Sequence, residues 1–380
     1  MSSEPIYLDH NATTPILPEV VRAMSDAALS APGNPSSLHT AGRESRSLLE
    51  GCRERIAQRL GARASEIVFT SGGTEANQLA ILGSLAATRT PGKVRHAVVS
   101  QIEHPSTLAV YRQLEAAGEL SVDWVPADAD GRVDPERIAT ALRSDTAIVS
   151  LLHASNETGV VQAIDAVSEL CRHHALAFHC DAVQSLGKIE VQVESLGADL
   201  VTLSGHKIHG PRGAGALWVR TGRPFVHPWG GGSQERGWRP GTENLAGVAG
   251  FATAVEHLEP VRKNLRDRLL RRILQDCPGA VLNGCEKDLV PNTLNVSFCG
   301  LSAETLLIRL DLAGVYASSG TACASGAREP SHVLRSMGLD EARVSGAVRF
   351  SLGRGTTTDD VDRAGDVVVS IVRDLLGDCD

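Results

Sequence analysis

The fold of this chain is constrained most by a repeated alternation between short apolar runs and longer stretches of helical periodicity. Strands are expected at residues 66–70, 96–100, 147–153, 177–180, 199–203 and 214–220. Helices are expected before and between them, at residues 43–60, 75–87, 107–117 and 165–174. Most of these strands are continuously apolar, which is typical of strands that are covered on both faces. The order therefore predicts βαβ units that build a mostly parallel sheet with helices on both faces.

The last third of the chain is expected to form a second, smaller lobe, because 380 residues exceed the roughly 100–200 residues of a usual single domain. A loop rich in glycine, tryptophan and arginine at 230–241 precedes a long helical stretch that is expected from 246 to 276. Within that stretch Leu265, Leu269 and Ile273 form an apolar stripe at four-residue steps. The smaller lobe is completed by expected strands at 293–298 and 347–351 and expected helices at 303–313 and 358–376.

The charge balance argues against some classes of protein. The chain has 37 basic and 45 acidic residues, whereas a dedicated nucleic-acid or membrane-surface binder normally carries a basic excess. Six basic residues within 262–272 are therefore interpreted as the solvated face of a helix. The N-terminus shows no secretory signal, and no window holds 18 consecutive apolar residues. We expect a cytoplasmic protein that binds neither nucleic acid nor a membrane directly.

The eight cysteines form no C-x-x-C pair, which removes most of the support for a structural zinc site or dithiol redox chemistry. Reduced thiols and no bound metal are expected. Cys323 differs from the other cysteines because it lies among small residues at 317–326. Nothing in the neighbouring sequence activates its thiolate, so the position alone favours an inert loop thiol.

Two polar residues at strand ends point to the chemistry of the larger lobe. Asp181 follows the strand at 177–180, and Lys207 follows the next strand along the chain. Ligands of open α/β sheets bind beyond the carboxyl ends of the strands. An aspartate and a lysine there suit pyridoxal phosphate, whose aldehyde bonds to the lysine and whose pyridinium nitrogen pairs with the carboxylate. The alternative interpretation is a surface salt bridge between these two residues.

A phosphate site is suggested by the residues around these strand ends. The glycine-rich turn at 70–77 follows a strand and opens a helix, so its backbone N–H groups can receive an anion, and Thr74 adds a hydroxyl. Ser204 and His206 flank Lys207 and offer further donors. The turn is no Walker loop, because the G-K-[ST] triplet is absent, and a glycine-rich turn without phosphate remains an alternative.

An ordered series of stretches matches a known family from about Tyr7 to Arg354. Among these stretches are YLDHNATTP at 7–15, SGGTEAN at 71–77, EHP at 103–105, NETG at 156–159, DAVQ at 181–184, SGHKIHGP at 204–211, RPGTEN at 239–244, SSGTAC at 318–323 and RFSLG at 349–353. On these motifs the chain resembles the cysteine desulfurases, which are pyridoxal phosphate enzymes. The loop at 318–323 is similar to the branch that serves iron–sulfur cluster assembly and tRNA thiolation.

The resemblance implies an α/β fold, the pyridoxal-phosphate-dependent transferase fold of type I. An N-terminal segment (1–15) would pack with the small domain, residues 16–255 would form the cofactor-binding domain, and residues 256–380 a small α+β domain that carries the Cys323 loop. Lys207 would hold the cofactor covalently and shuttle protons, and His104 would stack on the ring and act in proton transfer. The remaining cofactor contacts implied are Asp181 to the ring nitrogen, Gln184 to the ring hydroxyl, Asn156 beside the ring, and Gly73, Thr74, Ser204 and His206 to the phosphate.

The resemblance also implies the substrate and the sulfur route. Arg349 would bind the carboxylate of L-cysteine, with Asn11 and Asn156 nearby, and Thr242 would reach the phosphate from the second subunit of a homodimer. Cys323 would attack the substrate sulfur, form a persulfide, release alanine and pass the sulfur to a protein acceptor. That acceptor would be a cluster scaffold, a tRNA-thiolation relay or a DNA phosphorothioation system.

Two alternatives remain open at this point. One is another class V aminotransferase or lyase that acts on a different amino acid, which would have no need of the Cys323 loop. The other is a non-catalytic sulfur-carrier subunit, against which the residues Lys207, Asp181 and Arg349 argue.

Overall fold

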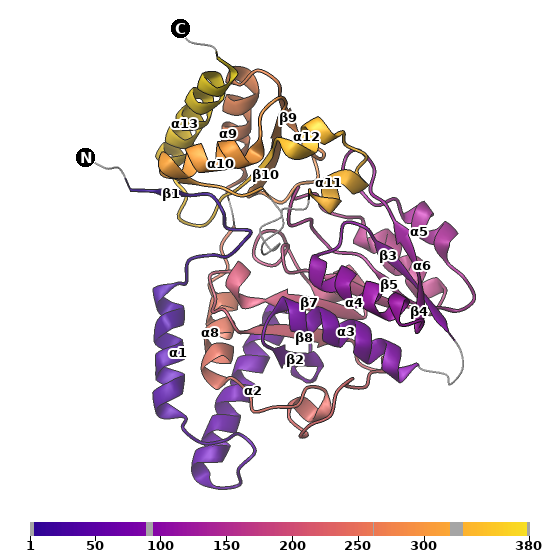
Figure 1. Ribbon diagram of the computed structural model, residues 1–380. Helices are drawn as coiled ribbons and strands as arrows, with labels where there is room; N and C mark the ends of the chain where they lie inside the picture. The colour runs from indigo at the N-terminus through magenta and orange to yellow at the C-terminus, as the bar shows by residue number, and fades with distance from the viewer. Residues whose placement is uncertain (1–3, 89–93, 261, 320–329, 378–380) are drawn as a thin grey trace.

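The computed structural model describes residues 4–88, 94–260, 262–319 and 330–377, and its central element is a seven-stranded sheet (Figure 1). The strand order is β2-β8-β7-β6-β5-β3-β4, in which β3 to β7 run parallel and β8 is antiparallel to both of its neighbours. The strands are β2 (Ile67–Thr70), β3 (Arg95–Ser100), β4 (Leu120–Val125), β5 (Thr146–Ser150), β6 (Ala177–Asp181), β7 (Leu200–Ser204) and β8 (Gly215–Val219). The predicted mostly parallel sheet is confirmed.

Helices cover both faces of this sheet, and the two faces use alternate residues of each strand. In β3, Val98 joins the apolar core shared with α1 (Pro18–Ser30), α2 (Thr40–Leu60), α6 (Ile164–His173) and α8 (Leu245–Glu256). Its neighbours Ala97 and Val99 join the core under α3 (Gly73–Ala87) and α4 (Pro105–Ala116) instead. Because both faces are buried, the strand is apolar at successive positions. The short helices α5 (Pro135–Ala141) and α7 (Val193–Leu196) also contribute side chains to the first core.

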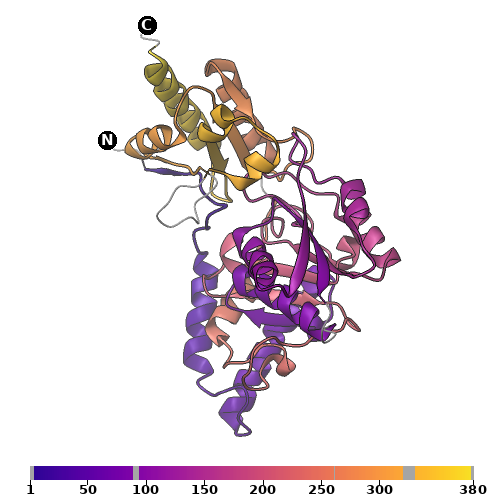
Figure 2. The same ribbon diagram turned by 45° about the vertical axis from the view of Figure 1, so that its right-hand side comes forward.

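A smaller lobe has its own antiparallel sheet and its own apolar core. The sheet has the order β12-β10-β9 and is packed with α9, α10 and α13. These elements are β9 (Ala280–Leu282), β10 (Thr293–Phe298), β12 (Ala347–Ser351), α9 (Lys263–Asp276), α10 (Ala303–Leu312) and α13 (Thr358–Leu376). The short helices α11 (His332–Ser336) and α12 (Glu341–Ser345) contribute their buried side chains to the core of the larger lobe instead. Figures 1 and 2 both show this lobe beside one end of the large sheet.

The N-terminal segment connects the two lobes. Strand β1 (Ile6–Tyr7) pairs in parallel with β11 (Val315–Tyr316), and Ile6 and Leu8 enter the core of the smaller lobe. A few residues later the chain begins α1, which packs with α8 against the larger lobe (Figure 2). Residues 9–14 therefore pass between the lobes, beside the ends of β6 and β7.

The single helix expected from 246 to 276 is wrong, because α8 ends at Glu256 and α9 begins at Lys263. Pro260 explains the break, since proline lacks the N–H donor and disfavours a helical conformation of the residue before it. On α9, Arg268 and Arg272 are partly exposed and pair with Asp362 and Asp366 of α13. Five of the six basic residues within 262–272 are exposed, as expected, but Arg266 is buried and donates to the backbone oxygen of Val290 at 2.8 Å, so it is not part of a solvated face.

Six cysteines lie in the described part of the chain, and all six are free thiols. Five of them are buried, as expected, while Cys299 is partly exposed. Burial raises the pKa of the Cys171 thiol to about 12 and that of Cys277 to about 11, so neither is a thiolate at neutral pH. In the same described ranges, no helix combines the length and the apolar character needed to cross a membrane.

Candidate active site

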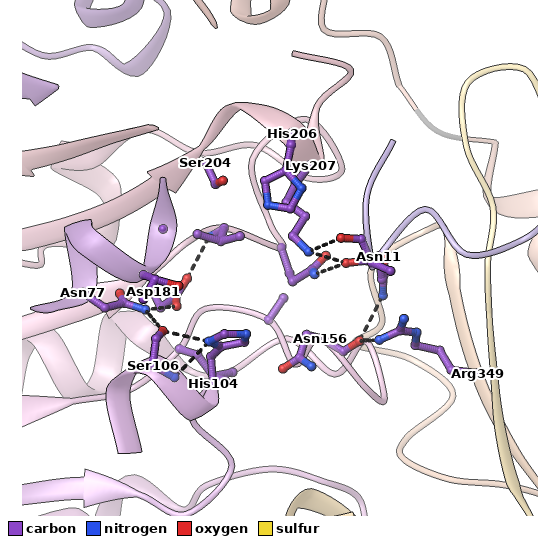
Figure 3. A pocket seen from close by; sticks show the side chains of 17 residues that line it. Asn11, Asn77, His104, Ser106, Asn156, Asp181, Ser204, His206, Lys207 and Arg349 are labelled. Carbon is purple, nitrogen blue, oxygen red and sulfur yellow. Dashed lines mark hydrogen bonds between the residues drawn. The ribbon is translucent and has the colours of Figure 1, made fainter. Parts of the chain in front are cut away.

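A cavity of about 290 Å³ lies where β6 and β7 end, at the junction of the two lobes (Figure 3). The larger lobe supplies Asp181, the last residue of β6, and Lys207, in the turn after β7. The smaller lobe supplies Arg349 from β12, and the connecting segment supplies Asn11. Eleven of the thirteen predicted site residues line the cavity: Asn11, Gly73, Thr74, His104, Asn156, Asp181, Gln184, Ser204, His206, Lys207 and Arg349.

One wall of the cavity is the N-terminus of α3, which begins at Gly73. A side chain at Gly73 would place its Cβ 3.0 Å from Val183 Cγ2, so glycine keeps this helix end open. Ser204 Oγ is buried beside it and has no hydrogen-bond partner among the described residues. A buried hydroxyl without a partner is costly, and an anion at the helix N-terminus would supply one. The wall therefore fits the phosphate of the predicted cofactor.

His206 lies on the same side of the cavity. Burial and the neighbouring charges of Lys207 and Arg212 lower the pKa of His206 to about 4, so its imidazole is neutral at pH 7. Its Nδ1 lies 3.2 Å from Thr13 Oγ1. A neutral imidazole still carries one N–H, which can be donated to a phosphate oxygen.

Asp181 is the buried carboxylate of the site. Its Oδ1 accepts the backbone N–H of Val183 at 2.9 Å, and its Oδ2 accepts Asn77 Nδ2 at 2.8 Å. These two donors fix the plane of the carboxylate at the end of β6. A carboxylate held in this way suits a protonated ring nitrogen, because the charged pair is shielded from water.

Lys207 extends from the turn after β7 toward the connecting segment. Its Nζ donates to the backbone oxygens of Asn11 at 2.6 Å and Ala12 at 2.8 Å. Gln184 Nε2 donates to the same Asn11 oxygen at 3.0 Å. Both side chains therefore converge on the segment that joins the lobes, and the Lys207 amine lies within reach of a ring held by Asp181 (Figure 3).

A second lysine, Lys188, stands behind this wall and was not predicted. Its Nζ donates to Asn11 Oδ1 at 2.9 Å and contacts Gln184 Oε1. Burial, followed by the charges of Lys207 and Arg349, holds the pKa of Lys188 well below its usual range. Its position four residues after Gln184 was the only available sequence signal, and that spacing is meaningful only where the chain is helical.

His104 forms the opposite wall, at the start of α4. Its Nδ1 accepts the backbone N–H of Ser106 at 3.1 Å and lies 2.7 Å from Ser106 Oγ. Burial lowers the pKa of His104, and the charges of Lys207 and His332 act in the same direction, while Asp181 opposes them. The imidazole is therefore neutral at pH 7 and lines the cavity.

Arg349 reaches the cavity from the smaller lobe, and its side chain is only 3% exposed. Its Nη1 donates to the backbone oxygen of Asn156 at 2.9 Å, and its Nη2 donates to Asp9 Oδ1 at 2.7 Å. Its Nε is buried without a hydrogen-bond partner in the described part of the chain. A charged N–H left over in this way favours binding of an anionic ligand.

The predicted nucleophile Cys323 lies outside the described residues, but both flanks of its segment are fixed beside the cavity. Ser318 exchanges two backbone hydrogen bonds with Arg349, at 3.1 and 2.6 Å. On the other flank, Ser331 Oγ donates to the buried Glu157 Oε2 at 2.5 Å. His332 Nε2 donates to the backbone oxygen of Glu103 at 3.0 Å. Glu157 and Glu103 directly neighbour the cavity residues Asn156 and His104.

Thr242 is described but does not line the cavity. It is exposed in a loop that Glu235 anchors, through a buried ion pair with both terminal nitrogens of Arg53 at 2.6 and 2.8 Å. The expectation that Thr242 completes the site of a second subunit stays a prediction.

The residues present fit pyridoxal phosphate, and the comparisons with known proteins agree. The model of the class-V aminotransferases matches residues 6–364. The chain therefore belongs to the class-V aminotransferase family, whose cofactor is pyridoxal 5′-phosphate. The predicted fold type and cofactor are confirmed.

More similar proteins narrow this class to the cysteine desulfurases. The cysteine desulfurase IscS of Dictyoglomus turgidum is 41% identical over 97% of this chain and 95% of its own length. A solved NifS-like protein is 32% identical, with a TM-score of 0.88 over 97% of this chain and 99% of its own. SspA, solved in complex with cysteine, is also 32% identical, with a TM-score of 0.82 over 91% of this chain and 98% of its own. Within its family the chain belongs with the cysteine desulfurases.

Proposed function

We propose that the chain removes the sulfur of L-cysteine, releasing L-alanine and leaving a persulfide on Cys323. One observation carries the proposal: the Lys207 amine, the fixed Asp181 carboxylate and the Arg349 guanidinium, whose Nε–H has no partner among the described residues, all face one cavity. Both flanks of the Cys323 segment are held by hydrogen bonds beside this cavity. Similarity to a protein solved in complex with cysteine supports the choice of substrate.

The cofactor would be held by residues from three segments of the larger lobe: the start of α3, the end of β6 with the turn after it, and the end of β7 with the turn after it. Gly73, Thr74, Ser204 and His206 would bind its phosphate, Asp181 its ring nitrogen, Gln184 its ring hydroxyl, and Lys207 would be its covalent attachment point. When bound, pyridoxal phosphate supplies an electron sink for negative charge that develops at the substrate Cα.

The side chains around the ring would then orient the substrate and move its protons. Arg349 and Asn11 bind the carboxylate of L-cysteine, and Asn156 helps to place it. Lys207 Nζ, once released from the cofactor, takes the proton from the substrate Cα. His104 Nε2 donates and accepts protons on the opposite wall, a role for which a neutral imidazole is suited.

The sulfur step would use Cys323 as a thiolate. Its Sγ attacks the substrate sulfur, so that one S–S bond forms and the Cβ–S bond of the substrate breaks. The electron pair of the broken bond stays on Cβ, which is protonated and leaves as the methyl group of alanine. Sulfur is oxidised and carbon is reduced by the same two electrons, so no external oxidant is needed. The persulfide then passes its outer sulfur to a protein acceptor.

The assembly and the setting of this reaction follow the same proposal. Residues 16–255 form the cofactor domain, residues 256–380 carry the Cys323 segment, and residues 1–15 pack with the latter. Two copies form a homodimer in which Thr242 of one chain reaches the phosphate of the other. The enzyme works in the cytoplasm, and its acceptor serves iron–sulfur cluster assembly or thiolation of a nucleic acid, without direct binding of nucleic acid.

The proposed activity is tested by incubating the purified protein, loaded with pyridoxal phosphate, with L-cysteine and a thiol reductant. We expect alanine and sulfide in a one-to-one ratio, because each turnover breaks one C–S bond and the reductant releases the persulfide sulfur. L-Alanine and L-serine as substrates serve as controls and give no sulfide. Amino-group transfer to a 2-oxo acid without sulfide release would contradict the proposal and show aminotransferase activity instead.

Replacing Arg349 with lysine should lower kcat/KM for L-cysteine. Lysine keeps the charge but loses the planar set of donors, of which two are already held by Asn156 and Asp9. Loss of one hydrogen bond to a charged group, about 2 kcal/mol, corresponds to roughly a 30-fold fall in kcat/KM, carried mainly by KM. Steady-state kinetics measure this. Arg335→Lys, at an exposed position on α11, is the control and should stay within about twofold of wild type.

A further inference from the structure

A row of polar side chains that line the cavity, Asp181, Asn77, Ser106 and His104, is joined by hydrogen bonds (Figure 3). Asn77 Nδ2 donates to Asp181 Oδ2 at 2.8 Å and to Ser106 Oγ at 2.9 Å. Ser106 Oγ lies 2.7 Å from His104 Nδ1, which also accepts the Ser106 backbone N–H at 3.1 Å. The row therefore runs from the carboxylate of β6 through α3 to the imidazole of α4.

Counting hydrogens fixes the direction of every bond in this row. The Asn77 amide nitrogen carries two hydrogens, one for Asp181 and one for Ser106 Oγ. Because Ser106 Oγ accepts from Asn77, its own hydrogen is free to be donated, and His104 Nδ1 lies at hydrogen-bonding distance. Two donors thus point at Nδ1, and in a neutral imidazole only an unprotonated nitrogen can accept them. The single ring hydrogen must be on Nε2.

We propose that Asn77 and Ser106 are positioning residues that hold His104 as the Nε2–H tautomer and fix its ring at a set orientation relative to Asp181. In this role neither side chain touches the reacting atoms, because each acts by orienting His104 or Asp181. The amide of Asn77 cannot be turned around without placing its oxygen against the Asp181 carboxylate. The repulsion between these oxygens therefore fixes which atoms donate and which accept along the row.

The surroundings of the ring support the same state. The charged or titratable groups that act on His104 are Asp181, Lys207 and His332; burial, Lys207 and His332 lower the pKa of His104, and Asp181 opposes them. Protonation of Nδ1 would also turn its hydrogen toward the Ser106 backbone N–H, 3.1 Å away. A neutral ring with one defined N–H can stack on a cofactor ring and still exchange a proton through Nε2.

The test uses the holoenzyme with ¹⁵N-labelled histidine, in which nitrogen chemical shifts distinguish protonated from unprotonated ring nitrogens. A parallel His104→Gln sample identifies the His104 signals by their loss. In the wild-type protein we expect an unprotonated Nδ1 and a protonated Nε2. In Ser106→Ala, which keeps the backbone donor but loses the hydroxyl, we expect an increased population of the Nδ1–H tautomer and a raised pKa of His104.

Kinetics provide the second arm. Ser106→Ala should lower kcat about fivefold with KM for L-cysteine nearly unchanged, the equivalent of one net hydrogen bond of about 1 kcal/mol. Ser106→Thr, which restores the hydroxyl, should recover both the tautomer and kcat. Thr107→Val is the matched control, because Thr107 is also buried on the same helix and its Oγ1 has no hydrogen-bond partner among the described residues.

Several outcomes would overturn the proposal. A wild-type spectrum that places the proton on His104 Nδ1 would overturn it alone, whether or not any variant folds. So would a Ser106→Ala spectrum identical to wild type, or an equal loss of kcat in Thr107→Val, which would indicate general disturbance of α4. The kinetic arm rests on the proposed function, but the spectroscopic arm needs no turnover, so failure of the two ideas can be told apart.

Discussion

Cys323→Ser should abolish the release of sulfide from L-cysteine while leaving the earlier steps of the reaction intact. A serine hydroxyl cannot accept sulfur as a persulfide, and it is not ionised at neutral pH as a thiol can be. We expect sulfide formation to fall below about one thousandth of wild type, a loss typical of removing a nucleophile. Exchange of the substrate α-proton in deuterated water should persist, because Lys207 and His104 are unchanged. Mass spectrometry of the substrate and a sulfide assay measure the two effects separately.

The control for this prediction is Cys299→Ser, since Cys299 is the partly exposed cysteine of the described ranges. That variant should keep sulfide release within about twofold of wild type, as surface substitutions usually do. Undiminished sulfide release by Cys323→Ser would contradict the persulfide route. Loss of both sulfide and α-proton exchange would instead indicate a damaged cavity.

The sequence predicts the larger sheet well because its strands are buried on both faces, and a continuous apolar run is a strong signal. Its limits are equally physical. Edge strand β4 has buried and partly exposed residues in mixed order, so no clear run marks it. The antiparallel insertion of β8 between β2 and β7 depends on contacts between distant segments, which local patterns do not encode. Pro260, by contrast, is a local signal, and it is sufficient to predict a break in the helix expected at 246–276.

The same distinction separates the parts of the candidate site. Asp181 and Lys207 could be paired from the residues alone, because the carboxyl ends of neighbouring strands meet at one edge of a sheet. Asn11 and Arg349 are brought together only by tertiary packing over more than three hundred residues, and only the family resemblance indicated them. Asn77 belongs to the motif at 71–77, but this motif alone predicts no function for it. Its four-residue spacing from Gly73 nevertheless places both residues on one face of α3. Ser106 offered no signal beyond following His104.

Lys207→Ala should eliminate turnover and the absorption band of covalently bound pyridoxal phosphate together. The expected fall in kcat is at least about 10³-fold, because the residue would serve both as the attachment point and as the group that moves the α-proton. Absorption spectroscopy of the purified protein, followed by the sulfide assay, measures both. The cofactor should still bind without the covalent bond, since Asp181 and the N-terminus of α3 are unchanged.

Lys188 makes this prediction discriminating, because it is a second amine that shares Asn11 with Lys207. Its Nζ is directed to Asn11 Oδ1 and Gln184 and does not line the cavity, whereas Lys207 does. Lys188→Met should therefore retain the band of the covalently bound cofactor, even if loss of its contact with Gln184 alters kcat. A band that survived Lys207→Ala but disappeared in Lys188→Met would move the attachment point to Lys188.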